Sequence, residues 1–119
     1  MSLPLFERAA EYRAKTAIVA PEGVFTFGDL LDASARVATR LLAGRDDLDS
    51  ERICFLVSPG WHYVSVQWGV WRAGGLAVPM ATSHPPAELA YVLDDTQGEA
   101  VVAHPKLLDR ISAAAAERR

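Results

Sequence analysis

Residues 53–57, the apolar run Ile-Cys-Phe-Leu-Val, constrain the fold of this chain more than any other stretch. A continuous apolar run of this length, followed by the turn residues Ser58, Pro59 and Gly60, is typical of a β-strand that is buried on both faces. Central strands of parallel sheets have this composition because helices cover both sides of the sheet. The run therefore predicts an α/β fold with a parallel sheet.

The rest of the C-terminal half alternates between helical and strand-like patterns. The first expected helix ends at Gly74 and Gly75, and a strand follows at residues 76–79. The next helix begins at Pro85 and Pro86 and ends at Gly98, and a strand follows at residues 100–103. A last helix begins at Pro105. Two successive strand–helix–strand units with right-handed crossovers make the strands parallel. About three parallel strands are fewer than the ~5–6 of an average sheet. With the uncapped last helix, this predicts a partial sheet from a larger domain, and a natural small protein is the alternative.

The N-terminal half predicts a small hairpin between two helices. A helix over residues 4–13 should carry Leu5, Phe6, Ala9 and Tyr12 on one face. Strands at residues 16–19 and 24–26 flank the turn residues Pro21, Glu22 and Gly23. Thr26 and Asp29 are spaced as a capping box for a helix that Gly44 ends, and residues 45–50 read as a polar surface loop.

Three stretches, in order, carry a resemblance to the adenylate-forming superfamily. The stretch VFTFGDL at residues 24–30 resembles the (L/F)-T-(Y/F)-x-(E/D)-L element of these enzymes, and WGVWRAGGLAVP at 68–79 resembles A-x-x-x-A-G-x-x-x-V-P. The stretch P-x-EL-x-YVLDD at 86–95 is similar to the helix that follows. QWGVW at 67–71 and SHP at 83–85 are most similar to malonate and methylmalonate CoA ligases. The resemblance covers roughly residues 16–105 and implies that residues 1–119 are an N-terminal part of the AMP-binding large domain.

The resemblance implies a ligase with two half-reactions. A carboxylate attacks the α-phosphate of ATP to form an acyl-adenylate and pyrophosphate, and the thiol of CoA then displaces AMP. ATP, Mg²⁺ and CoA are the implied cofactors, a small carboxylic acid is the implied substrate, and the remainder of the ligase chain is the implied partner. The phosphate-binding loop that ends in Pro-Lys-Gly, the acidic residue for the ribose and the C-terminal lysine are not among the 119 residues. No catalytic residue is therefore assigned, and the chain alone is expected to be inactive.

One candidate binding site follows from the strand ends. Ligands of open parallel sheets bind beyond the carboxyl ends of the strands, and in the family the loops after the last two strands lie near the entrance for the CoA nucleotide. The resemblance thus implies a CoA nucleotide site, with Lys106 meeting phosphate and hydroxyls donating hydrogen bonds. Its candidate residues are Thr82, Ser83, His84, His104 and Lys106. An ordinary polar loop is the alternative.

Other conspicuous residues favour structural roles. Trp61, Trp68 and Trp71 share a helical stripe, which indicates core packing more than an adenine platform. His62, His84 and His104 lack the spacing of metal ligands, so we expect no metal site. Ser58 lacks a G-x-S-x-G motif and Cys54 lies in an apolar strand, so neither is expected to be a nucleophile.

Composition limits the partners and the compartment. A net charge of −3 gives no electrostatic footprint for nucleic acid, and the sequence has no apolar run long enough to span a membrane. A single cysteine excludes an internal disulfide and fits a cytoplasmic location.

Besides the ligase, two alternative functions stay open. The chain could be a non-catalytic module that forms homo-oligomers through exposed sheet edges, or it could be the opening of an amino-acid-activating domain of a peptide synthetase.

Overall fold

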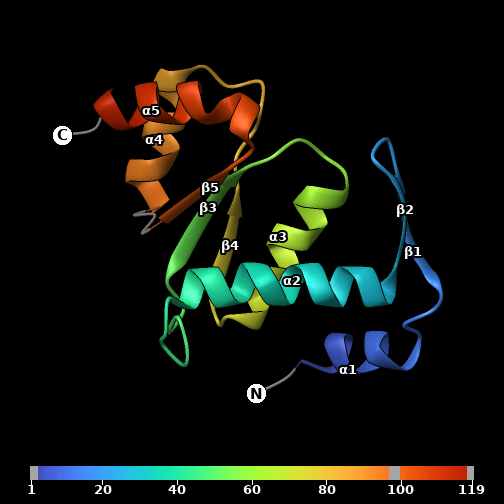
Figure 1. Ribbon diagram of the computed structural model, residues 1–119. Helices are drawn as coiled ribbons and strands as arrows, with labels where there is room; N and C mark the ends of the chain where they lie inside the picture. Colours follow the sequence, from blue (N-terminus) through green and yellow to red (C-terminus); the bar gives the residue numbers. More distant parts are fainter. Residues whose placement is uncertain (1–2, 97–99, 118–119) are drawn as a thin grey trace.

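Strand β3 (Arg52–Leu56) lies at the centre of a three-stranded parallel sheet, between β4 (Leu76–Pro79) and β5 (Ala100–Ala103). The computed structural model describes residues 3–96 and 100–117 (Figure 1). The other elements are α1 (Pro4–Glu11), β1 (Thr16–Ala20), β2 (Gly23–Thr26), α2 (Phe27–Leu42), α3 (Trp61–Arg72), α4 (Pro86–Thr96), a 3-10 turn (Pro105–Leu107) and α5 (Leu108–Glu117). The predicted α/β fold, with its parallel strands and antiparallel hairpin, is confirmed.

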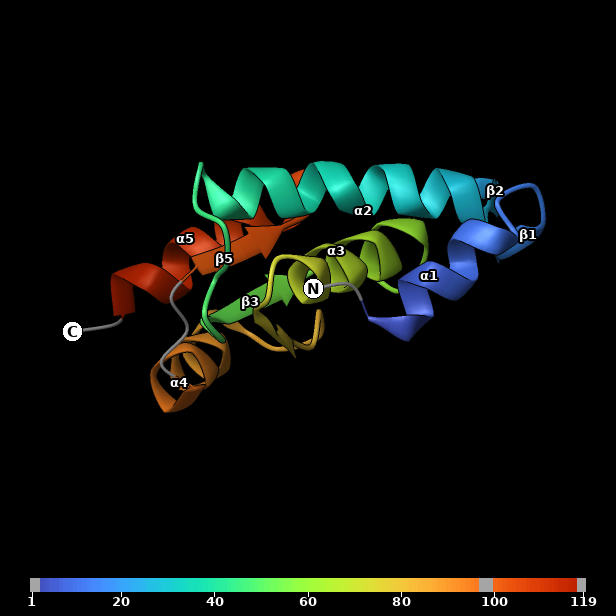
Figure 2. The same cartoon turned by 90° about the horizontal axis from the view of Figure 1, so that it is seen from below.

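Helices cover both faces of β3, as its apolar run predicts. Phe55 packs in a core with Val66 and Val70 of α3, whereas Leu56 packs with Leu89 of α4 and with Ala114 of α5. Alternate residues of a strand point to opposite faces, so each face needs its own apolar cover. Figure 1 shows α2 and α3 on one side of the sheet and α4 and α5 on the other, and α2 and α4 also lie on opposite sides of β3 in Figure 2.

Helices α2 and α3 cross closely at Gly69. A side-chain carbon added there would lie 2.5 Å from Cβ of Val37 and 3.1 Å from the carbonyl oxygen of Ser34. Beside this crossing, Arg72 donates hydrogen bonds to the Leu31 carbonyl (2.7 Å) and to Oγ of Ser34 (3.0 Å). The crossing therefore depends on the absence of a side chain at residue 69.

The tryptophan stripe belongs to a third core, as predicted. Trp68 is buried and meets Phe6 of α1 edge to face, with ring centroids 5.2 Å apart. Trp61 stacks on Phe25 of β2 at 4.0 Å, which fastens the hairpin to the start of α3. On the predicted face of the first helix, Phe6 and Ala9 are buried, whereas Leu5 is 44% exposed and Tyr12 38% exposed. The helix ends at Glu11 and Tyr12 caps it, so only the middle of α1 reaches this core.

Local signals set both ends of α2 as predicted. Oγ1 of Thr26 accepts a hydrogen bond from the Asp29 amide (3.1 Å), and Oδ2 of Asp29 accepts one from the Thr26 amide (2.9 Å). This reciprocal pair satisfies two backbone donors that the first turn of a helix leaves free. At the other end, Ala43 and Gly44 adopt positive φ angles of 50° and 92° and end the helix.

The loop at residues 45–50 is not entirely a surface loop. Leu48 is 1% exposed and packs in the core beside Phe55. Its amide donates to the Ala73 carbonyl (2.8 Å), which fixes the loop against the turn after α3. Arg45 closes the loop with hydrogen bonds of 2.6 and 3.1 Å to Glu51, and these bonds hold the pKa of the Glu51 carboxyl below its usual value.

The last third of the chain follows the predicted order. Strand β5 spans residues 100–103, and a 3-10 turn at Pro105 leads into α5. Gly98, the predicted end of the preceding helix, and Arg119, up to which the last helix was expected to run, lie outside the described residues.

Candidate functional site

The loops that follow the three parallel strands begin at one edge of the sheet. The Met80 amide donates to the Phe55 carbonyl (2.9 Å), and the His104 amide donates to the Leu56 carbonyl (3.1 Å). These bonds continue the strand pairing by one residue on each side of β3. The polar residues after each strand therefore lie at the carboxyl edge, where open parallel sheets bind ligands.

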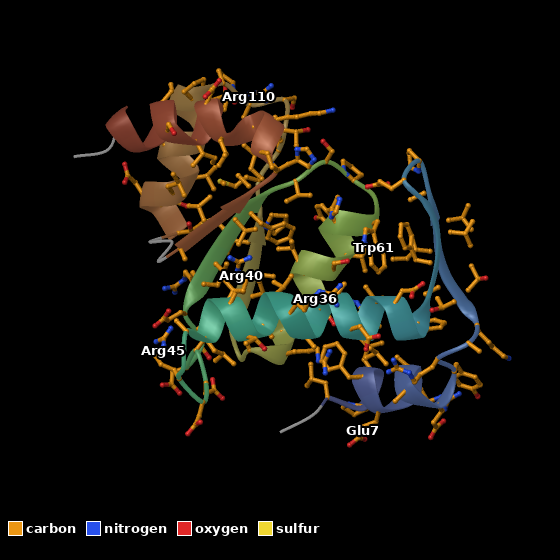
Figure 3. The ribbon with its side chains drawn as sticks, in the orientation of Figure 1. Glu7, Arg36, Arg40, Arg45, Trp61 and Arg110 are labelled. Carbon is orange, nitrogen blue, oxygen red and sulfur yellow. The ribbon has the colours of Figure 1, made fainter. Side chains whose placement is uncertain are left out.

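Thr82 and Ser83 line one hollow at this edge. The hollow has a volume of about 350 Å³, and Val57, Tyr63 and Met80 contribute to its apolar wall. Arg110 of α5, labelled in Figure 3, donates a hydrogen bond to the Thr82 carbonyl. This bond ties the loop after β4 to α5.

His104 and Lys106 line a second hollow, of about 320 Å³, together with Ser58, His62 and Glu22. Nδ1 of His104 accepts a hydrogen bond from the Lys106 amide (3.1 Å), which leaves Nε2 as the ring's other polar atom. The rings of His62 and His104 have centroids 6.1 Å apart. Lys106 is a cation suited to an anionic group, whereas the carboxylate of Glu22 would repel one.

The five candidate residues therefore do not share one cavity. Val57 lines both hollows, but Thr82 and Ser83 line only the first, and His104 and Lys106 only the second. His84 lines neither of them: its Nε2 lies 3.4 Å from Oε2 of Glu88, one turn further along α4. Nδ1 of His84 is buried and has no hydrogen-bond partner among the described residues.

Two residues at this edge were missed by the sequence analysis. Glu22 belongs to the hairpin turn, and its carboxylate oxygens lie 2.9 Å from where a side-chain carbon of Gly60 would stand. Gly60 has a φ of 146°, a conformation that favours glycine. Arg110 lies on α5, 28 residues from Thr82. Neither contact has a local sequence signal, because each joins elements that are distant in the sequence.

Chemical groups elsewhere in the chain are built into the core or scattered. Cys54 is buried as predicted, with its Sγ 3.6 Å from Oγ1 of Thr96. Within residues 3–96 and 100–117, no three His, Cys, Asp or Glu side chains gather in a way that could hold a metal ion. None of the described helices is long and apolar enough to cross a membrane.

This geometry defines the class of protein: an α/β domain with a three-stranded parallel sheet and polar loops at its carboxyl edge. The family model of the AMP-binding enzymes matches residues 5–119. The chain belongs to this family, the adenylate-forming enzymes.

Several relatives have names that state an activity, and these names show which adenylate-forming enzymes the chain resembles. The mitochondrial malonate–CoA ligase of Xenopus laevis is 38% identical over 114 residues, and that of Homo sapiens is 36% identical over 115. These matches cover 92% and 93% of this chain but only 20% of each relative. An N-(5-amino-5-carboxypentanoyl)-L-cysteinyl-D-valine synthase of Penicillium rubens is 31% identical over 113 residues, which are 94% of this chain and 3% of the synthase. The predicted resemblance to malonate–CoA ligases is thus confirmed, and the chain spans about a fifth of their length.

Solved structures agree on the fold. MatB from Rhodopseudomonas palustris is 28% identical, with a TM-score of 0.78 over 98% of this chain and 24% of that protein. The inhibitor-bound N-terminal domain of FACL13 from Mycobacterium tuberculosis has a TM-score of 0.84 over 97% of this chain and 29% of that domain, at 22% identity. The sheet, the helices and the hairpin therefore have the arrangement found in larger adenylate-forming enzymes.

Proposed function

We propose that this chain is the N-terminal structural part of an ATP-dependent carboxylate–CoA ligase that acts on malonate or methylmalonate. The identity of 36–38% with malonate–CoA ligases, over nearly the whole chain, carries this proposal. In such a ligase the chain builds one part of the large domain's sheet and a wall of the CoA entrance. ATP, Mg²⁺ and CoA would be bound by the complete ligase, because the phosphate-binding loop is not among these 119 residues.

The 119-residue chain by itself is expected to release no pyrophosphate from ATP and malonate. A ligase polypeptide that begins with these residues should form malonyl-CoA, because it would also carry the phosphate loop and the C-terminal lysine of the family. Pyrophosphate release and acyl-CoA formation would be measured for both, with malonate, methylmalonate and acetate compared. Activity of the short chain would disprove the scaffold role, and a complete ligase that prefers acetate would disprove the substrate.

Amino-acid activation is the second candidate function. The identity of 31% with a peptide-forming synthase over 94% of the chain favours it. ATP–pyrophosphate exchange with amino acids distinguishes the two candidates, because a carboxylate–CoA ligase should exchange with malonate and not with α-amino acids.

The strand-end hollows, together with His84 in the loop after β4, are proposed to border the CoA nucleotide. In the complete ligase, Lys106→Ala and His84→Ala should raise the KM for CoA by about three- to tenfold, which is the effect of losing roughly 1 kcal/mol of binding. The rate of adenylation, measured without CoA, should stay unchanged. Arg52→Ala is the matched control, since Arg52 is an exposed cation that begins β3 at the opposite edge of the sheet. An unchanged dependence on CoA would remove both residues from the site.

Two further expectations stay predictions. The vertebrate relatives carry the word mitochondrial in their names, so the predicted cytoplasmic location needs fractionation of cells that express this protein.

Strands β4 and β5 are the outer strands of the described sheet. Self-association through these edges would require backbone pairing between copies.

A further inference from the structure

A groove between α2 and α3 lies beside the hollow of His104 and Lys106, and His62 lines both of them. The helices touch at Gly69 and diverge toward the start of α3, which opens a space of about 740 Å³. Its apolar wall comes mainly from Ala33, Val37, Trp61 and Val66. The buried hydroxyl of Ser65 already donates to the Trp61 carbonyl (2.8 Å), so it offers no free donor for a small ligand. Arg36 and Arg40 also line this space. We call the space, together with these two arginines, the α2–α3 groove.

Two arginines on α2 line this groove. Arg36 and Arg40 are one helical turn apart and both are exposed. Figure 3 shows them in succession along α2, with Trp61 at the start of α3. Neither guanidinium makes a hydrogen bond or an ion pair with another described residue. Like charges at this spacing repel each other, and a carboxylate-bearing apolar surface laid in the groove would relieve that repulsion.

The same chain carries a surface with the complementary character. Tyr91 of α4 is 69% exposed, an unusual exposure for a large aromatic side chain. Glu88 and Asp95 are also exposed and lie one turn before and after it on the same helix face. We call these three residues the acidic α4 face. It has an aromatic centre and a carboxylate on each side, and the Glu88 carboxylate also lies 3.4 Å from Nε2 of His84. The α2–α3 groove has an apolar wall lined by cations.

One molecule cannot join these two surfaces. Helix α4 packs on the face of β3 opposite to that of α2 and α3 (Figures 1 and 2). The acidic α4 face that meets the groove must therefore come from another molecule. We propose that the α2–α3 groove binds the acidic α4 face of a second copy of this chain. The contact is heterologous, since each molecule uses a different surface, and it permits chains of molecules to grow.

The spacing of the charges fits this contact. Glu88 and Asp95 are separated by ~10 Å along the axis of α4, and Arg36 and Arg40 by ~6 Å along α2. The long, flexible arginine side chains can cover the difference, with Tyr91 between them against Trp61 and Val66. Exposed ion pairs of this kind weaken as salt is added, so association should fall with increasing sodium chloride.

Charge reversal tests the proposal on the whole 119-residue chain. Sedimentation equilibrium from about 10 μM to about 1 mM should show association of the unaltered chain, within the affinity range of weak contacts. Arg36→Glu/Arg40→Glu and Glu88→Arg/Asp95→Arg should each associate about tenfold more weakly. Mixing the two reversed variants should restore the association, because each groove then meets an α4 face of opposite charge.

Controls separate this contact from misfolding and from other surfaces. Arg8→Glu/Arg52→Glu makes the same change in net charge at exposed positions outside the groove, and it should associate like the unaltered chain. Circular dichroism should show each variant folded, and Tyr91→Ser offers an uncharged second variant that should also weaken association. The proposal is overturned if the unaltered chain stays monomeric at 1 mM, if both reversals leave association unchanged, or if the mixture of variants does not associate.

Discussion

Gly69→Val is expected to lower the free energy of unfolding by about 3 kcal/mol or more, because overpacking of a tight helix crossing cannot relax easily. The new Cβ would stand 2.5 Å from Cβ of Val37, and the carbonyl oxygen of Ser34 would be 3.1 Å away. Relief requires that α2 and α3 move apart. That movement would also disturb the hydrogen bonds from Arg72 to the Leu31 carbonyl and to Ser34.

Urea denaturation followed by tryptophan fluorescence would measure this loss. Ala87→Val is the control, because Ala87 is exposed on α4 and valine there adds its bulk at the surface. The control should change the free energy of unfolding by less than about 1 kcal/mol, mainly through the lower helix propensity of valine. A Gly69→Val variant as stable as the control would show that the two helices do not cross as closely as described.

Phe55→Ala is expected to cost about 3–5 kcal/mol, the usual range for a large aromatic side chain removed from a core. Phe55 is completely buried on the central strand, and its ring meets Tyr63 of α3 edge to face with centroids 5.1 Å apart. Domains are stable by only about 5–15 kcal/mol. The substitution should therefore remove most of the stability of this chain.

Phe55→Leu separates the loss of volume from other effects. Leucine keeps much of the buried volume, so this variant should lose only about 1 kcal/mol. Thermal unfolding monitored by circular dichroism would compare the two variants. If Phe55→Ala were no less stable than Phe55→Leu, β3 could not be the buried centre of the sheet.

Much of the fold could be predicted because its signals are local. The capping box of Thr26 and Asp29, the glycine end of α2 and the apolar run of β3 each depend on a few neighbouring residues. Leu48 shows the limit of such signals. It stands among polar residues, and only the contact of its loop with the turn after α3 buries it.

The candidate site could be predicted only in part. Thr82, Ser83, His104 and Lys106 do lie at the carboxyl edge, since strand ends and parallel order follow from the sequence. Their division between two hollows could not be foreseen, because it depends on how Val57 and the loop after β4 pack. The carboxylate of Glu22 reaches this edge only through the hairpin, which the stacking of Phe25 on Trp61 holds in place.

The sequence by itself determined the order of helices and strands, the buried central strand and the membership of the adenylate-forming family. These follow from periodicity, caps and short motifs, in which the deciding residues are near neighbours along the chain. Only the tertiary structure decided the crossing of α2 and α3 at Gly69, the groove that opens beside it and the position of the acidic α4 face on the far side of the sheet. Such features depend on the shapes of side chains from elements that meet only after folding, and no local pattern records which surfaces will face each other.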